Sequence, residues 1–194
     1  MILLSIEEIK LYLKENIVEK RYEHILGVAE TAKKLAKLNG ISKEKAVIAA
    51  LAHDVAKNLK KDRMKEIMEK NNIVLSEVEE KNPNLWHGII APIEAKDKLG
   101  IEDEDVLDAI RWHTTGKENM SILTKIIYIA DMIEPSRDFQ GVEEIRKLTF
   151  ENLDLGVYYG LTRSIEFLLT KNLLIDENTM KARNYFLFDS KFKI

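Results

Sequence analysis

Apolar residues recur every three or four positions along most of this chain, and that spacing is the period of an α-helix. Near the N-terminus, Ile6, Ile9, Leu13 and Ile17 follow it and would share one helix face. Such a face has to be buried against a neighbouring element to be stable. The sequence therefore predicts an all-α fold in which amphipathic helices bury a common core.

Capping signals divide this pattern into successive helices. Ser5 followed by Glu8 is a capping box, which opens a helix. Pro92 is expected in the first turn of its helix, where a missing amide hydrogen costs nothing. The predicted helices lie at about 6–17, 21–38, 43–58, 61–70, from 76 onward, 92–99, 103–112, 121–133, 142–148 and 154–170, with a short helix from 176 followed by the apolar segment 185–188.

Composition limits the classes of protein that this chain can be. Its 194 residues are 45% hydrophobic and 32% charged, and no repeat or long linker divides them, so one globular domain is expected. The net charge of -3 gives no general attraction to nucleic acid or to membranes. The absence of cysteine excludes disulfides, thiolate metal ligands and a cysteine nucleophile. The N-terminal segment is charged from Glu7 onward and lacks the apolar core of a signal peptide, so a cytoplasmic protein is expected.

One histidine is predicted to point into the core. His24 lies in line with Val28, Thr31, Leu35 and Leu38 at helical spacing, so its side chain faces inward. Taken alone, an inward histidine is most often a core residue with its hydrogen bonds satisfied. The other titratable residues in apolar segments decide between that interpretation and a functional one.

Two aspartates stand where a helix should be buried. His53 and Asp54 follow the apolar run 47–52, and Asp131 follows the apolar run 126–130. Burying an ionised carboxylate without a partner costs several kcal/mol, so each needs a cation, either a buried Arg or Lys or a metal. Imidazole nitrogens with carboxylate oxygens are ligands that suit iron, manganese, cobalt or zinc.

The order His24, His53-Asp54, Asp131 resembles the HD superfamily of metal-dependent phosphohydrolases. A His-Asp dipeptide alone occurs often by chance, but this order in this helical context is specific. His87 and His113 fall between the dipeptide and the last aspartate, where HD enzymes with two metals place additional histidines.

A closer resemblance extends over about residues 20–187. The segments that carry it are Arg21–Val28, Ala52–Lys57, Trp86–Gly88, Trp112–Gly116, Tyr128–Pro135 with Arg137, and Thr179–Asn184. They look like the YqeK family, bacterial HD proteins that hydrolyse diadenosine tetraphosphate symmetrically. The resemblance implies an HD-domain helical bundle spanning 1–194 as a single domain. Its core would be at about 20–135, and helices and tail at about 140–190 would pack on that core and close the nucleotide site.

The resemblance also implies roles for individual residues. It implies a di-metal centre, usually of iron, with His24, His53, Asp54 and Asp131 at one metal and His87 and His113 at the second. Asp54 would bridge the metals, and His87 and His113 have an alternative role as hydrogen-bond donors to phosphate. Catalysis would rest on Asp54, Lys57, His87 and His113.

Several side chains are then expected to contact the substrate. Lys57 follows His53 by four residues and Asp54 by three, so one face of the predicted helix would carry all three. The expected substrate contacts are Arg21, Lys57, His87, His113, Thr114, Arg137, Thr179, Arg183 and Asn184. For the charged members the ordinary alternative is a surface ion pair or a solvated side chain, and for the threonines it is a helix cap.

Two other functions remain open at this point. The chain could be an HD phosphohydrolase for a nucleoside monophosphate, a guanosine alarmone or a cyclic dinucleotide, since the metal ligands specify phosphate chemistry and not a base. It could also be a nucleotide-binding regulator without turnover. Release of ADP would separate an enzyme from a regulator. The expected partners are a dinucleoside polyphosphate and the product ADP, with the chain a monomer or a homodimer.

Overall fold

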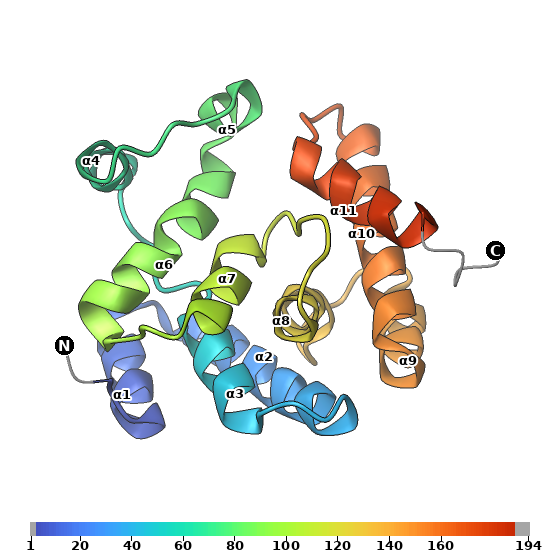
Figure 1. Ribbon diagram of the computed structural model, residues 1–194, viewed down its shortest axis with the longest axis horizontal. Helices are drawn as coiled ribbons and strands as arrows, with labels where there is room; N and C mark the ends of the chain where they lie inside the picture. Colours follow the sequence, from blue (N-terminus) through green and yellow to red (C-terminus); the bar gives the residue numbers. More distant parts are fainter. Residues whose placement is uncertain (1–2, 189–194) are drawn as a thin grey trace.

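The computed structural model describes residues 3–188, and every regular element among them is helical (Figure 1). The elements are α1 (Ile6–Asn16), α2 (Glu19–Leu38), α3 (Lys43–Ala52), α4 (Lys61–Lys70), α5 (Glu77–Lys81), the 3-10 turn η1 (Pro83–Leu85), α6 (Trp86–Leu99), α7 (Glu104–Trp112), α8 (Ile122–Ile133), α9 (Val142–Glu151), α10 (Leu153–Thr170) and α11 (Glu177–Phe188). The predicted all-α single domain is confirmed. Residues 1–2 and 189–194, which the predicted domain includes, lie outside the described range. Of the described helices, none has both the length and the hydrophobicity needed to cross a membrane.

Side-chain caps fix where several helices begin. At the start of α1, the Ser5 hydroxyl accepts the backbone N–H of Glu8, and the Glu8 carboxylate accepts the backbone N–H of Ser5. Ser76 and Glu79 form the same reciprocal pair at α5, and Ser121 caps α8. Each cap satisfies an amide that has no helical partner and contributes about 1 kcal/mol. These starts agree with the sequence prediction because a cap is a local interaction.

Helix α6 begins earlier than predicted. It starts at Trp86, so Pro92 lies in its interior and not in its first turn. Proline cannot donate a hydrogen bond to the carbonyl of Gly88, four residues earlier. The helix continues nevertheless because residues on both sides of the proline, among them Ile90 before it and Ala95 after it, are buried. As a result, His87 stands in the first turn of a helix.

Helix α3 ends earlier than predicted. It stops at Ala52, whereas the sequence suggested an end near Asn58. Beyond it the chain turns through i to i+3 hydrogen bonds, such as that from the Lys57 amide to the Asp54 carbonyl at 2.9 Å. His53 is therefore the C-terminal cap of α3, and the residues that follow it lie in turns.

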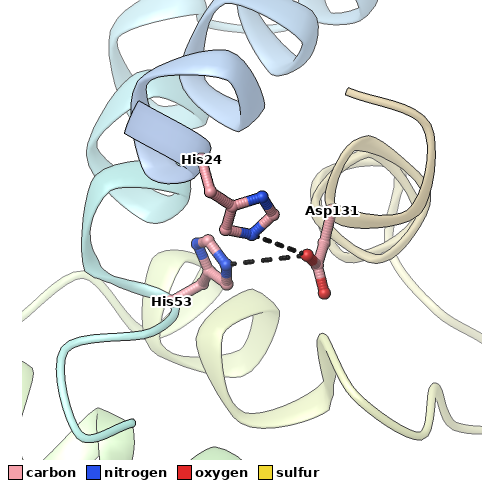
Figure 2. A group of neighbouring side chains, drawn as sticks. All are labelled: His24, His53 and Asp131. Carbon is pink, nitrogen blue, oxygen red and sulfur yellow. Dashed lines mark ion pairs between the residues drawn. The ribbon is translucent and has the colours of Figure 1, made fainter. Parts of the chain in front are cut away.

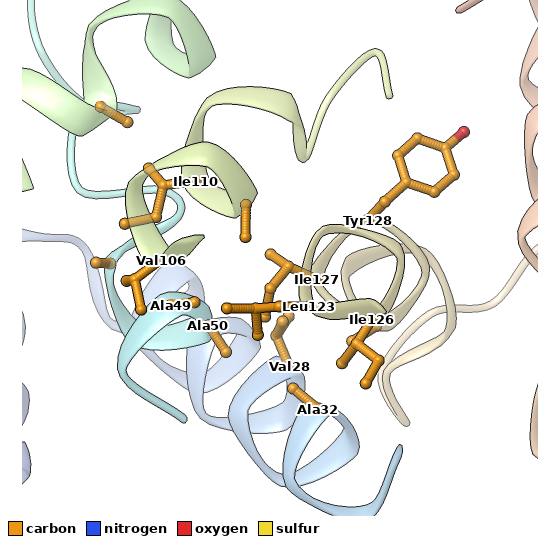
Figure 3. Packing of buried hydrophobic residues seen from close by; sticks show 14 of the residues in the cluster. Val28, Ala32, Ala49, Ala50, Val106, Ile110, Leu123, Ile126, Ile127 and Tyr128 are labelled. Carbon is orange, nitrogen blue, oxygen red and sulfur yellow. The ribbon is translucent and has the colours of Figure 1, made fainter. Parts of the chain in front are cut away.

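Helix α8 lies at the centre of the fold. It contacts α2, α3 and α7 on one side and α9 and α10 on the other (Figure 1). Figure 3 shows Leu123 and Ile127 of α8 among Val28, Ala50 and Ile110 from three other helices. Burying an isoleucine side chain fully contributes roughly 1.5–3 kcal/mol, so this contact region anchors α8. The polar side chains of its last turn are held at a fixed position as a consequence.

The C-terminal helices pack on one another beside α8. Gly156 of α10 lies so near α9 that a Cβ atom there would be 2.5 Å from the Cα of Thr149, so only glycine permits this approach. Helix α11 runs through segment 185–188, where a short helix followed by an apolar segment was predicted. It is longer because Ala182 and Phe186, four residues apart, are both buried. The proposed closing of a nucleotide site by these helices stays a prediction.

Candidate metal centre

Four histidines and two aspartates meet where five helices converge. We call this group the histidine–aspartate cluster; its members are His24, His53, Asp54, His87, His113 and Asp131. His24 comes from the interior of α2, the His53-Asp54 pair follows α3, His87 opens α6, His113 follows α7, and Asp131 lies in the last turn of α8. All are buried except the half-buried Asp131. The structure thus brings together every residue predicted to bind metal.

One half of the cluster is formed by His24, His53 and Asp131 (Figure 2). The Nε2 atom of His24 lies 3.0 Å from Oδ1 of Asp131, and Nε2 of His53 lies 4.0 Å from the same oxygen. One ligand atom from each residue lies within 4.8 Å of the others, so a single ion can reach all three. His24 and Asp131 are on separate helices, and only tertiary packing unites them.

Asp54 connects this half to the other histidines. Its Oδ1 lies 3.3 Å from Nε2 of His87 and 3.6 Å from Nε2 of His113, while its Oδ2 lies 3.7 Å from Nε2 of His53. A second group that can hold an ion consists of His53, Asp54 and His113. The two oxygens of Asp54 thus face different histidines, which is the orientation that a bridging carboxylate requires.

Three of the imidazoles are oriented by the backbone. His53, His87 and His113 each hydrogen-bond through Nδ1 to the carbonyl oxygen three residues earlier, at 2.6, 2.7 and 2.8 Å. An acceptor at Nδ1 places the imidazole hydrogen on that atom and leaves the lone pair on Nε2. The Nε2 atoms of His87 and His113 then meet at 3.1 Å, inside the cluster.

The donor set fits a divalent transition metal. Nε2 of His53 is a buried polar atom without a hydrogen-bond partner among residues 3–188. An unsatisfied buried polar group costs about 1–3 kcal/mol, so its presence calls for an explanation. A cation at this position would accept the lone pair, and the neighbouring nitrogen and oxygen donors are those of iron, manganese, cobalt and zinc sites.

The protonation states of two imidazoles and both aspartates favour metal binding, whereas the pKa of His24 is raised because Asp131 and Glu134 outweigh its burial. Burial lowers the pKa of His53 to about 4 and that of His87 to about 3, so both imidazoles keep their lone pairs at neutral pH. Burial alone would raise the pKa of Asp131, but its contact with His24 and the positive charge of Arg137 hold it well below its usual range. The pKa of Asp54 is held low against burial by the adjacent histidines. Metal ligands have to be deprotonated in this way.

Cationic side chains surround the cluster. Nη1 of Arg21 lies 2.8 Å from Oδ2 of Asp54, and Nη2 of Arg137 lies 2.6 Å from Oδ1 of Asp131. Nζ of Lys57 is 3.1 Å from Nε2 of His87, and burial lowers the pKa of this lysine. Both arginines remain partly exposed, so they can offer further N–H groups to an anion.

Two cavities adjoin the cluster and share residues. The larger, of about 670 Å³, is lined by Lys57, Thr114 and Thr179 together with apolar side chains of α10 and the loop after it. The smaller, of about 240 Å³, is lined by Asp131, Arg137 and His113. Thr114 and Ser164 line both cavities. The cluster thus lies beside a space that is cationic near the metal ligands and apolar further away.

The structure does not bring all the expected substrate contacts to this space. Thr179 is buried and lines the larger cavity, as Thr114 does. Arg183 instead faces α10, where its Nε and Nη2 donate to Thr162 at 3.2 Å and to the Tyr158 hydroxyl at 3.1 Å. Its Nη1 donates to the Asn184 side chain, and neither residue lines the two cavities.

One residue of the site was missed by the sequence analysis. Glu134 is only 1% exposed, and its Oε1 lies 3.0 Å from Nδ1 of His24. Burial alone would raise the pKa of Glu134, but the hydrogen bonds from Ser136 and His24 lower it by more. The net pKa is below the ordinary value, so the carboxylate is ionised. The signal in the sequence is that Glu134 follows Asp131 by three residues, on the same side of α8.

Comparisons with known proteins agree with this site. The model of the HD domain family matches residues 21–136, a range that contains the whole histidine–aspartate cluster. A Bacillus subtilis protein named symmetrical bis(5'-nucleosyl)-tetraphosphatase is 38% identical over 184 residues, covering 95% of this chain and 98% of that protein. A protein of the same name from Halalkalibacterium halodurans is 41% identical, covering 92% of this chain and 95% of that protein.

A solved structure shows the same fold. It is the crystal structure from Clostridium acetobutylicum described as a "predicted HD superfamily hydrolase involved in NAD metabolism". Its TM-score to this chain is 0.92 at 45% sequence identity, and the match covers 96% of this chain and 98% of that one.

Proposed function

The chain belongs to the HD domain family, and from its similarity to the two symmetrical tetraphosphatases we propose that it hydrolyses diadenosine tetraphosphate symmetrically to two ADP. It is a metal-dependent phosphohydrolase that acts on a phosphoanhydride bond, and similar dinucleoside polyphosphates belong to the same substrate class. The curated relatives of this name match nearly the whole length of both chains, so the likeness extends beyond the metal ligands to the C-terminal helices.

One observation carries the proposal. A cluster of imidazoles and carboxylates, with Arg21, Lys57 and Arg137 in contact with it, lies beside two cavities that share Thr114 and Ser164. A dinucleoside tetraphosphate has the matching form, because it carries a run of negative phosphates between two nucleosides. The cations attract the phosphates, and the apolar part of the larger cavity suits a base or a ribose.

We assign the cluster residues to two metal positions. His24, His53, Asp54 and Asp131 would hold one ion, and His87 and His113 the other, with Asp54 between them. Two divalent cations held in this way polarise phosphoryl oxygens and lower the pKa of water. Iron is the metal that we propose, because the family resemblance implies it, and manganese, cobalt and zinc are alternatives that the nitrogen and oxygen ligands also suit. If only one ion binds, His87 and His113 would have to gain a proton on Nε2 to donate to phosphate, because Nδ1 of each already bonds to a backbone carbonyl.

The chain's own residues orient the phosphates for attack. Lys57 and the free N–H groups of Arg21 and Arg137 would bind the phosphates of one ADP half of the substrate. The hydroxyl of Thr114 can donate a hydrogen bond to the same phosphates. Holding that half fixes which phosphorus faces the cluster. Groups placed in this way accelerate a reaction by positioning and by stabilising negative charge in the transition state. Cleavage at the inner phosphorus then gives two equal products.

Product analysis tests the proposal. Purified protein loaded with Fe²⁺, Mn²⁺ or Co²⁺ is incubated with diadenosine tetraphosphate, and the nucleotides are separated by chromatography. ADP as the sole early product, with oxygen from ¹⁸O-labelled water in the new terminal phosphate of one ADP, supports symmetrical hydrolysis. ATP with AMP would refute it. Binding without turnover under every metal would indicate a nucleotide-binding regulator, and faster turnover of a nucleoside monophosphate, an alarmone or a cyclic dinucleotide would indicate another HD phosphohydrolase.

A further inference from the structure

The four imidazoles of the cluster are not oriented by the same kind of partner. His53 and His113 stand at the ends of α3 and α7, where the last carbonyls have no helical donor and can accept from Nδ1. His87 uses a carbonyl of the 3-10 turn before α6. His24 lies within α2, where the nearby carbonyls already accept helical amides. Its Nδ1 therefore needs an acceptor from another part of the chain.

Glu134, at the end of α8, supplies that acceptor. Its Oε1 is 3.0 Å from Nδ1 of His24, and its Oε2 accepts the backbone N–H of Ser136 at 2.7 Å. The Ser136 hydroxyl also donates to Oε1. Both carboxylate oxygens are thus used, and the orientation of the carboxylate is fixed by the turn that follows α8.

That turn is itself fixed by α9. The guanidinium of Arg146 donates to the backbone carbonyls of Ile133, Glu134 and Arg137, each at 2.8 Å. Three hydrogen bonds from one side chain immobilise the segment that carries Glu134. The position of the carboxylate is therefore set by the fold and does not depend on His24 alone.

The facing helix leaves room for this carboxylate at a glycine. Gly27 follows His24 by three residues and lies on the same side of α2. A Cβ atom at Gly27 would lie 2.7 Å from Oε2 of Glu134, closer than real Cβ contacts. A glycine inside a helix is less favourable than alanine by about 1 kcal/mol, so this position has a reason to lack a side chain.

A second carboxylate makes the orientation consequential. Oδ1 of Asp131 lies 3.0 Å from Nε2 of His24, on the opposite edge of the ring from Glu134. Either carboxylate can accept the single hydrogen of a neutral imidazole. If the hydrogen is on Nε2, that atom cannot bind a metal. Glu134 competes with Asp131 for this hydrogen.

We propose that Glu134 is a positioning residue that holds His24 with its lone pair on Nε2, and that Gly27 is required because it makes room for the Glu134 carboxylate. The inference rests on the proposed metal site and adds to it the contact between Glu134 and the metal-binding His24. Outer carboxylates that orient a metal-bound histidine typically change metal affinity by about 10- to 100-fold.

The first test measures metal affinity without any substrate. Metal-free protein is titrated with Co²⁺, whose absorption reports binding, for the wild type, E134Q, E134A and the control E94Q. Glu94 is a buried carboxylate on α6 away from the cluster. We expect binding to weaken by about 10- to 100-fold in E134Q and E134A and to stay unchanged in E94Q. Glutamine cannot replace both contacts, because its amide nitrogen is a donor and would face another donor, either Nδ1–H of His24 or the backbone N–H of Ser136.

The second test uses nitrogen-15 NMR of the metal-free protein at alkaline pH, where imidazoles are neutral. We expect the wild-type His24 to carry its hydrogen on Nδ1, and E134A to move it toward Nε2 and Asp131. A merely structural role for Glu134 would lower the unfolding midpoint of E134Q and E94Q alike without changing the tautomer. That outcome would overturn the proposal.

The third test is a double-mutant cycle between Gly27 and Glu134. G27A should weaken Co²⁺ binding in the wild-type background and have no further effect in the E134A background, where the methyl group fits the vacated space. Equal losses in both backgrounds would refute the role given to Gly27.

A protein whose Co²⁺ affinity depends on Glu134 but which leaves diadenosine tetraphosphate intact would refute the proposed function alone. Hydrolysis with unchanged Co²⁺ affinity in E134A would refute this inference alone.

Discussion

Asp54→Asn is the substitution that probes the cluster most directly, because it removes one charge and keeps the shape of the side chain. The carboxylate lies 2.8 Å from Nη1 of Arg21, 3.3 Å from Nε2 of His87 and 3.6 Å from Nε2 of His113. An asparagine has only one oxygen, so it cannot face two ions, and its amide would oppose one of them. We expect metal affinity to fall by more than the roughly 10- to 100-fold loss typical of an outer partner, and hydrolysis to be abolished.

The structure also sets the cost in stability. Removing one partner of a buried ion pair costs about 3–5 kcal/mol, because the other charge is left alone. The Arg21 side chain is 30% exposed, so water replaces part of the lost interaction and the cost falls to about 1–2 kcal/mol. In a chain of this size 1 kcal/mol shifts Tm by about 2–4 °C, so the metal-free variant should melt roughly 2–8 °C lower with unchanged helix content.

Calorimetry of the metal-free protein and elemental analysis of the loaded protein test these expectations. Asp108→Asn is the matched control: Asp108 lies 2.6 Å from Nζ of Lys117, is half-buried, and belongs to no part of the cluster. It should keep full metal content and activity. Full metal occupancy in the Asp54→Asn protein would refute the role given to this carboxylate.

Three further predictions concern separate parts of the chain. Lys57→Met should retain metal but lower kcat/KM by about 10²-fold, since it removes a phosphate-binding charge; metal content and kinetics measured together check this. The hydrogen bond to Lys45 lowers the pKa of Asp103 in the folded protein. Asp103 therefore stabilises the fold at pH values above its unfolded pKa of 3.8, and this stability is lost as pH falls through the lower folded pKa. The difference in Tm between wild type and Asp103→Asn, which keeps the cap, should therefore vanish in acid. Gly156→Ala should destabilise the protein by about 1–3 kcal/mol in urea unfolding, because the new methyl group would overlap Thr149; equal or greater stability would contradict this packing.

Local chemistry accounts for what the sequence predicted correctly. The capping boxes at Ser5 and Ser76 act within four residues, so their sequence pattern is sufficient to place a helix start. Where nonlocal packing competes with a local signal, the prediction failed. Pro92 is an unfavourable interior residue, yet burial on both sides keeps α6 continuous from Trp86.

In the site too, the sequence marked some residues, and others could be identified only from the packing. The apolar surroundings of Asp54 and Asp131 marked them as residues in need of a cation, and the structure places both in the cluster. The contact of Glu134 with His24 joins residues 110 positions apart and left only a weak signal. Arg183, expected at the nucleotide, turns toward Tyr158 because α11 packs against α10.

The sequence by itself determined the helices, their caps and the inventory of imidazoles and carboxylates, because periodicity and capping depend on neighbours along one helix. Only the tertiary structure decided which nitrogen of each imidazole faces the cluster, which histidines each oxygen of Asp54 faces, and where the cavities lie. Those features depend on the directions in which side chains leave separate helices. The burial of apolar faces sets how those helices pack, and no local pattern records it.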